Sequence, residues 1–332
     1  MKLREIYETA VRMGIDADPR AREGVDQFLE RTRRQYEKMP EHLKVVFDTE
    51  ELSNPFSDTR VYLGDLEAEV RAIIAGIDMN TGEVLLADRL RERGWPIDAI
   101  YTHHPEGIGL SNIDKVMSLQ ADIWAEWGVP VQAGEKLIDE RREEVRHRFM
   151  PINAYQSIDA ADLLGIPFFS AHTPTDNLVY TYLTRYFEEH EAHTLGDVQR
   201  LLLDIPEYRI SARRAAGPSL DGSLAEKRAG RIYVDMTGGT EGPVAAIEKL
   251  ADRGVGTMVC MHMSKELRDE ADKRGIHVVI AGHMASDSLG INLLMDELER
   301  NGVAIVPTSG LIRVRRDERL RVLDEQPEVR FG

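Results

Sequence analysis

Cysteine is nearly absent from this 332-residue sequence, which contains only Cys260. A single cysteine cannot form an intramolecular disulfide, and it also excludes a zinc site built from cysteines. Because Cys260 lies inside an apolar stretch, we expect it to pack in the core as a small hydrophobic residue. The cysteine content therefore favours a reducing, cytoplasmic environment.

Long apolar runs are also missing. No segment approaches the roughly 18 consecutive apolar residues that a membrane-spanning helix needs. Residues 1–14, MKLREIYETAVRMG, are charged and lack the apolar stretch of a secretory signal. The sequence thus predicts neither a membrane span nor a secretion signal.

Positive charge is in deficit. There are 42 lysines and arginines against 58 aspartates and glutamates, which gives a net charge of −16. An acidic surface repels the phosphate backbone, and this argues against nucleic acid as a partner. An acidic balance suits a protein that holds divalent cations, but an ordinary solvated surface has the same composition.

The first 55 residues are predicted to form a helical N-terminal extension. Apolar residues recur at helical spacing over 3–11, and a second, highly charged helical run covers 21–47. Residues 52–58, LSNPFSD, have the turn-forming composition of a boundary. We therefore separate 1–55 from the rest of the chain.

The remaining sequence alternates strands with helices. Two apolar strands flank a helix over 81–93, which makes a βαβ unit and predicts a parallel sheet. We expect an α/β fold with a first unit over 56–230 and a second over 231–332, completed by a strand at 303–306. The predicted strands cover residues 72–77, 97–102, 165–171, 232–236, 257–261, 278–282 and 303–306.

Three of these strands end in histidine and carboxylate. The motifs are Thr102-His103-His104-Pro105-Glu106, His172-x-x-x-Asp176 and His283-x-x-x-Asp287. Ligands of open α/β sheets collect beyond the carboxyl ends of the strands, so the three ends can converge. Imidazole and carboxylate together suit Zn, Mn, Fe, Co or Ni, and adjacent histidines can serve two metals, one each. Taken singly, Asp176 and Asp287 could instead be helix N-caps.

Four further features remain open on the sequence alone. Glu106 is either a proton acceptor at the same strand end or a solvated loop residue. Asp78 either lines the crevice or caps a helix, and His262 either faces the cavity or packs with a hydrogen bond. The turn Gly238-Gly239-Thr240 offers backbone N–H groups to an anion, although close packing would explain its glycines equally well.

The three motifs also resemble a known family, the hexameric dinuclear-metal-centre proteins, called type 2 homologues of GTP cyclohydrolase I (the YbgI and YqfO group). The family pattern is a strand ending in HHP or HHG, a strand ending in aHTnlD, and a late GHyxSE. Here the counterparts are THHP at 102–105, AHTPTD at 171–176 and GHMASD at 282–287, in the same order. The resemblance covers roughly residues 60–315, including a glycine turn at 235–242.

This resemblance implies two divalent metal ions per protomer (Zn, Mn, Fe, Co or Ni). Its metal ligands correspond to His103, His104, Asp176, His283 and Asp287, and His172 is implied as a further ligand or as a hydrogen-bond donor to one. The family usually has glutamate where this chain has Asp287, so the shorter side chain is expected to bind one metal only, or through water. The implied fold is two interlocked α/β units with mixed sheets, assembled into a ring-shaped homohexamer.

The implied chemistry is hydrolysis. Two nearby cations can share a bridging water and leave a hydroxide nucleophile at neutral pH. We therefore expect a metal-dependent hydrolase acting on a small nucleotide-like or phosphorylated molecule, with a GTP cyclohydrolase type 2-like reaction as one candidate. The alternative is a non-catalytic metal-binding ring that stores or delivers metal, or that serves as an interaction scaffold.

Overall fold

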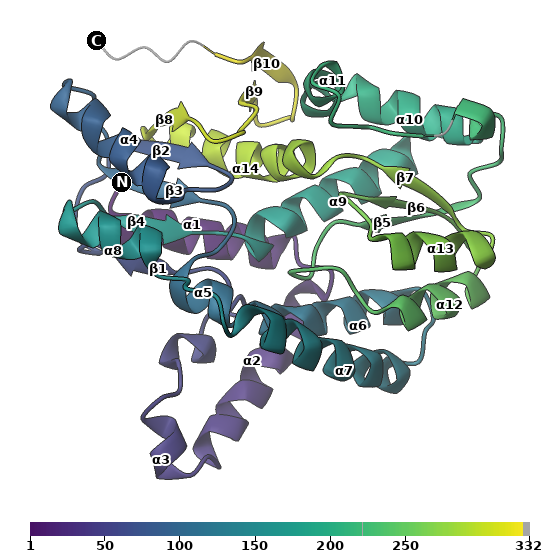
Figure 1. The fold of residues 1–332 in the computed structure, drawn as a ribbon, viewed down its shortest axis with the longest axis horizontal. Coiled ribbons are helices and arrows are strands. Elements are labelled where there is room, and N and C mark those ends of the chain that lie inside the picture. The colour runs from purple at the N-terminus through teal and green to yellow at the C-terminus, as the bar shows by residue number, and fades with distance from the viewer. Residues whose placement is uncertain (221, 328–332) are drawn as a thin grey trace.

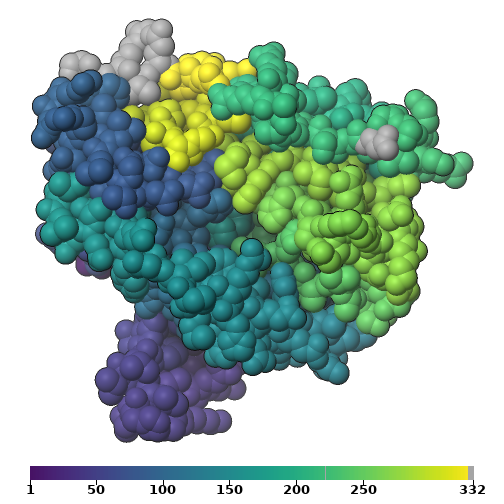
Figure 2. Space-filling view, viewed as in Figure 1, coloured from purple at the N-terminus to yellow at the C-terminus, as the bar shows by residue number. Residues whose placement is uncertain are grey.

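The computed structural model describes residues 1–220 and 222–327 (Figure 1). The N-terminal extension is helical, and its first helix, α1 (Leu3–Asp16), packs into the core through the buried side chains of Leu3, Ile6 and Ala10. Only the next two helices, α2 (Ala21–Glu37) and α3 (Glu41–Lys44), project from the body, as the purple arm in Figure 2 shows. The extension thus has an anchored part and a projecting part.

A five-stranded mixed sheet organises the first unit, with strand order β1-β4-β3-β2-β8. Only β1, at the edge, runs antiparallel to its neighbour. Strands β2, β3 and β4 are buried along their whole length, as expected for strands covered on both faces. The strands are β1 (Val61–Leu63), β2 (Ala72–Gly76), β3 (Ala99–Thr102), β4 (Phe168–Ser170) and β8 (Ala304–Pro307).

A three-stranded parallel sheet organises the second unit, in the order β5 (Arg231–Asp235), β6 (Val255–Cys260) and β7 (His277–Ile280). The prediction that the strand at 303–306 completes this unit is wrong. That strand is β8, and it pairs with β2 of the first sheet, with Ala304 opposite Ala72. The chain therefore returns to the first sheet near its end, which interlocks the two units.

Two long helices run between the sheets. Helix α9 (Thr173–Glu189) begins just after β4 of the first sheet and contacts β5 of the second, whereas α14 (His283–Arg300) begins after β7 and leads back to β8. The two helices touch at Gly290, where an added Cβ would lie only 2.2 Å from the carbonyl oxygen of Thr175. This close approach holds the first turn of α9 against the N-terminal half of α14.

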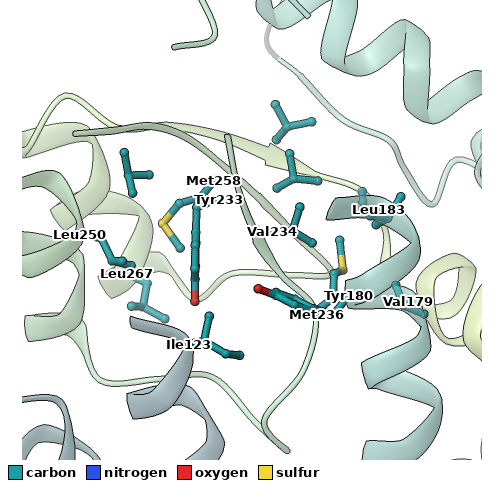
Figure 3. Packing of buried hydrophobic residues seen from close by; sticks show 14 of the residues in the cluster. Ile123, Val179, Tyr180, Leu183, Tyr233, Val234, Met236, Leu250, Met258 and Leu267 are labelled. Carbon is teal, nitrogen blue, oxygen red and sulfur yellow. The ribbon is translucent and has the colours of Figure 1, made fainter. Parts of the chain in front are cut away.

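The largest hydrophobic cluster surrounds the second sheet, where Tyr233, Met258 and Leu250 pack together (Figure 3). Cys260 is buried, as predicted. No helix in residues 1–220 and 222–327 is long and apolar enough to cross a membrane. The other elements are η1 (Thr49–Leu52), α4 (Thr81–Glu92), α5 (Gly107–Ser111), η2 (Ile113–Met117), α6 (Ser118–Glu126), α7 (Val131–Phe149), α8 (Gln156–Leu163), α10 (Leu195–Asp204), α11 (Pro206–Arg213), η3 (Gly222–Leu224), α12 (Val244–Asp252), α13 (Lys265–Lys273), β9 (Val314–Arg316) and β10 (Val322–Glu325).

Candidate metal centre

The structure brings the histidines and aspartates of the three motifs into one cluster. His103 and His104 follow β3, and their backbone N–H groups donate to the carbonyls of Gly76 and Ile77 at the end of β2. The other members lie at the first turns of α9 and α14. Their candidate ligand atoms form three groups, each within 4.8 Å: His103, His104 and His172; His104, His283 and Asp287; His103, Asp176 and Asp287.

Neither aspartate is a helix N-cap. The N-cap of α9 is His172 and that of α14 is Gly282, which places Asp176 and Asp287 inside their helices. Both carboxylates are almost fully buried, and they face the histidines instead of the backbone. The capping alternative is therefore wrong for both residues.

His103 presents a bare nitrogen to two carboxylates. The hydroxyl of Thr175 donates to the carbonyl of Ala171, so it accepts the Nδ1 hydrogen of His103 across 3.0 Å. Nε2 then carries the lone pair, 3.5 Å from Asp176 Oδ1 and 3.6 Å from Asp287 Oδ1. Burial lowers the pKa of His103 to about 4, so the ring is neutral at pH 7.

These three atoms are all acceptors, and they lie buried without a hydrogen-bond partner. Burial raises the pKa of Asp176 well above its usual value, so the three acceptors are unfavourable together unless a proton or a metal cation lies among them. Buried imidazole and carboxylate groups of this kind are suitable ligands for a metal ion.

Asp287 faces ligand groups on both of its sides. Its Oδ1 lies near His103, while its Oδ2 lies 3.6 Å from Nε2 of both His104 and His283. Asp287 therefore reaches both groups, although its side chain is one methylene shorter than that of glutamate.

Asp58 hydrogen-bonds to His172 on the side of the ring opposite the cluster. Asp58 was not identified as a site residue from the sequence. Its fully buried Oδ2 accepts from Nδ1 of His172 across 2.8 Å and from the hydroxyl of Thr173 across 2.6 Å. Nε2 of His172 is thereby left facing Asp176, 3.7 Å away. Burial would lower the pKa of His172, but Asp176 and Asp58 outweigh it and raise the pKa to about 9. In the sequence Asp58 closes a turn-rich stretch, so no spacing signal marks it.

Asp78 has the same role for His104. Its Oδ1 lies 2.6 Å from Nδ1 of His104, and the N-cap of the following helix is Asn80. Asp78 is therefore not the N-cap of that helix, and it contacts His104 of the cluster instead. A carboxylate on the far nitrogen fixes the ring orientation of a metal-binding histidine and makes it more basic.

Glu106 lies beside the cluster but outside its three ligand groups. It precedes α5, and its backbone N–H donates to the hydroxyl of Tyr62. Burial raises the pKa of its carboxyl group to about 7; a hydrogen bond with Ser157 opposes burial, Asp78 adds to it and His104 opposes it. The carboxyl group is therefore partly protonated near neutral pH.

The predicted glycine turn borders the crevice that opens onto the cluster. Gly239 and Thr240 line this crevice together with Asp176 and Asp287. His262 also lines the crevice, and its Nδ1 lies 3.1 Å from Glu241 Oε1. This histidine is therefore hydrogen-bonded and also faces the cavity, so each of the two alternatives is correct in part.

Solved structures identify the fold. A NIF3 superfamily protein from Sphaerobacter thermophilus matches with a TM-score of 0.70 and 25% sequence identity, over 92% of this chain and 98% of that one. This chain has the NIF3 superfamily fold. The predicted family resemblance and the α/β class are thereby confirmed. No protein-family model matches the chain, and no curated protein matches it.

More distant NIF3-type structures also align. Reduced HcgD from Methanocaldococcus jannaschii is 13% identical, with a TM-score of 0.47 over 80% of this chain and 94% of that one. The protein YbgI is 14% identical, with a TM-score of 0.45 over 76% of this chain and 90% of that one.

Replacing Asp58 with asparagine tests whether this residue supports the candidate metal centre through His172. We expect metal affinity to fall about 10- to 100-fold, because the ring of His172 loses the carboxylate that orients it. Competition with a chromogenic chelator would measure the change. Asp159→Asn, at an exposed position of α8, removes the same charge and should leave affinity unchanged. Equal affinities in the two variants would show that Asp58 has no part in the site.

Proposed function

We propose that this protein is a metal-dependent hydrolase that holds two divalent cations in the crevice. The observation that carries the proposal is the set of buried, unpartnered acceptors around His103 Nε2, where Asp176 and Asp287 point at a lone pair. A cation is the simplest group that satisfies all of them at once. The same donor set suits Zn, Mn, Fe, Co or Ni.

We assign the three overlapping ligand groups to two ions. His103 and Asp176, with His172 beside them, would hold one ion, while His104 and His283 would hold the other. Asp287 would contribute one carboxylate oxygen to each, since its two oxygens face different histidines.

Two divalent cations, when bound, lower the pKa of a shared water so that it can attack an electrophile at neutral pH. The residues of the chain orient and buffer this centre. Asp58 and Asp78 hold the imidazoles of His172 and His104 in position, and Glu106 accepts or returns a proton at the rim. We expect a small nucleotide-like or phosphorylated substrate, with a GTP cyclohydrolase type 2-like ring opening as one candidate, and a homohexameric assembly.

Glu106→Gln tests the catalytic part of the proposal. The substitution keeps the size of the side chain but removes its ability to take a proton, so turnover should fall about 10²- to 10⁴-fold. Metal content should stay at the wild-type value, because Glu106 belongs to none of the ligand groups. Hydrolysis of a panel of nucleotides and phosphoesters, with metal analysis of the same samples, provides both readouts.

Glu37→Gln, in the exposed part of α2, is the matched control and should keep full turnover. A protein that binds metal but hydrolyses no member of the panel in wild-type form would contradict the enzyme. Its properties would then be those of the alternative, a non-catalytic metal-binding ring.

A further inference from the structure

The crevice extends from the ligand cluster to the second sheet, where other residues line it. Asp235, Glu241 and His262 line both the crevice and a smaller cavity behind it, which Gln120 also lines. No lysine or arginine lines either cavity within residues 1–220 and 222–327. This end of the site therefore places a few hydrogen-bond acceptors beside apolar side chains such as Trp124, Leu250 and Met258, and His262 is its one basic side chain among the described residues.

Asp235 lies at the end of β5 and is only partly accessible to solvent. In the described part of the chain it forms no salt bridge with lysine or arginine; the Tyr233 hydroxyl hydrogen-bonds to it, and the charges that act on it come from His262 and Glu241. Burial raises the pKa of its carboxyl group to about 6, so it is mainly ionised at pH 7.5. A desolvated carboxylate without a fixed cation has a strong preference for an incoming N–H donor.

Gln120 supplies a second, independent acceptor. Its Nε2 donates to the carbonyls of Gly238 and Thr240, at 2.9 and 2.6 Å, and these two bonds fix which end of the amide is the oxygen. Oε1 is left without a hydrogen-bond partner, although the side chain is 97% buried (3% exposed). It points at Gly242, where an added Cβ would meet it at 2.7 Å.

Glu241 adds a third acceptor. Its Oε1 accepts the backbone N–H of Ser264 and a hydrogen bond from the ring of His262, and the Ser264 side chain is a further hydrogen-bond partner of this carboxylate. The turn at Gly238-Gly239-Thr240, predicted to bind an anion, stands beside these carboxylates. The N–H of Thr240 already donates to the carbonyl of Gly238, so it is not free for a phosphate.

We infer that this end of the crevice is a substrate subsite for a group that carries N–H donors and no negative charge, such as an amide, an amidine or an amino-substituted heterocycle. The inference rests on the proposed function, because it places the reacting bond at the ligand cluster and the recognised group on the second unit. Unpartnered buried acceptors discriminate strongly, since a ligand without matching donors leaves them unsatisfied. A phosphate of the substrate would lie toward the metal centre instead.

Binding of benzamidine, benzoate and inorganic phosphate tests the subsite. The full-length protein is titrated as purified and again after removal of metal with a chelator, so that anions cannot bind through metal in the second series. We expect benzamidine to bind in both series, and benzoate and phosphate to show no binding to the metal-free protein. Asp235→Asn should weaken benzamidine about tenfold or more, the loss expected for a charge-assisted hydrogen bond.

Asp272→Asn, exposed on α13 of the same unit, makes the same charge change and should leave benzamidine affinity unchanged. Glu241→Gln provides a second variant should Asp235→Asn fold poorly, and circular dichroism checks the fold of each. Benzamidine binding that neither subsite substitution weakens would overturn the inference, as would preferential binding of benzoate or phosphate to the metal-free protein. The experiment distinguishes the two proposals. Benzamidine binding without any metal binding would contradict only the proposed function. Metal binding without benzamidine binding would contradict only the subsite.

Discussion

The double substitution His103→Ala/His104→Ala is expected to remove nearly all bound metal. Wild-type protein should hold about two equivalents of transition metal per protomer, as a two-ion site requires. Each of the two histidines belongs to two of the three ligand groups, so their loss leaves every group incomplete. Inductively coupled plasma mass spectrometry on purified protein would count the metal directly.

The matched control is His190→Ala/His193→Ala, which removes two exposed histidines far from any ligand group. That variant should keep its metal. Wild-type protein that takes up no metal, even after incubation with Zn, Mn, Fe or Co, would refute the metal centre. The buried histidines and aspartates would then need another explanation for their unpartnered atoms.

Gly290→Val should destabilise the protein by about 3 kcal/mol or more, at the upper end of the usual range for overpacking. The first added carbon would already lie 2.2 Å from the Thr175 carbonyl, and a backbone atom within a helix cannot give way as a flexible side chain can. Helices α9 and α14 would have to separate, so metal content should fall as well. The midpoint of urea denaturation, with the metal content of the folded protein, measures both effects.

Gly82→Val is the control for the glycine-to-valine change itself. An added Cβ at Gly82, in the first turn of α4, meets nothing within 4 Å, and we expect less than about 1 kcal/mol of change from helix propensity alone. An unchanged denaturation midpoint for Gly290→Val would mean that the two helices are not held by this contact.

The candidate ligands could be found in the sequence because each motif follows a predicted strand or opens a helix. Apolar strands such as 97–102 are visible as short runs, and polar residues at their ends stand out. The i,i+4 spacing of His172 and Asp176 also has a direct structural meaning, since it places both at the start of α9. Local pattern was therefore sufficient for these residues.

Long-range partners could not be found in this way. Asp58 reaches His172 across 114 positions of sequence, and nothing in its own neighbourhood marks it as a buried ion-pair partner. The pairing of β8 with β2 likewise depends on tertiary packing, because the sequence of a short apolar strand does not indicate which sheet the strand joins. The helical character of α1 was visible, whereas its burial in the core was not.

The late position of β8 has a consequence for biosynthesis. A ribosome makes the chain from its N-terminus, so β2 emerges long before the strand that covers its outer edge. Until residues 304–307 appear, that edge presents unpaired backbone groups, which are prone to pair with other chains. Folding of the first sheet therefore cannot finish before the second unit is made, and the open edge of β2 must stay protected until synthesis is almost complete.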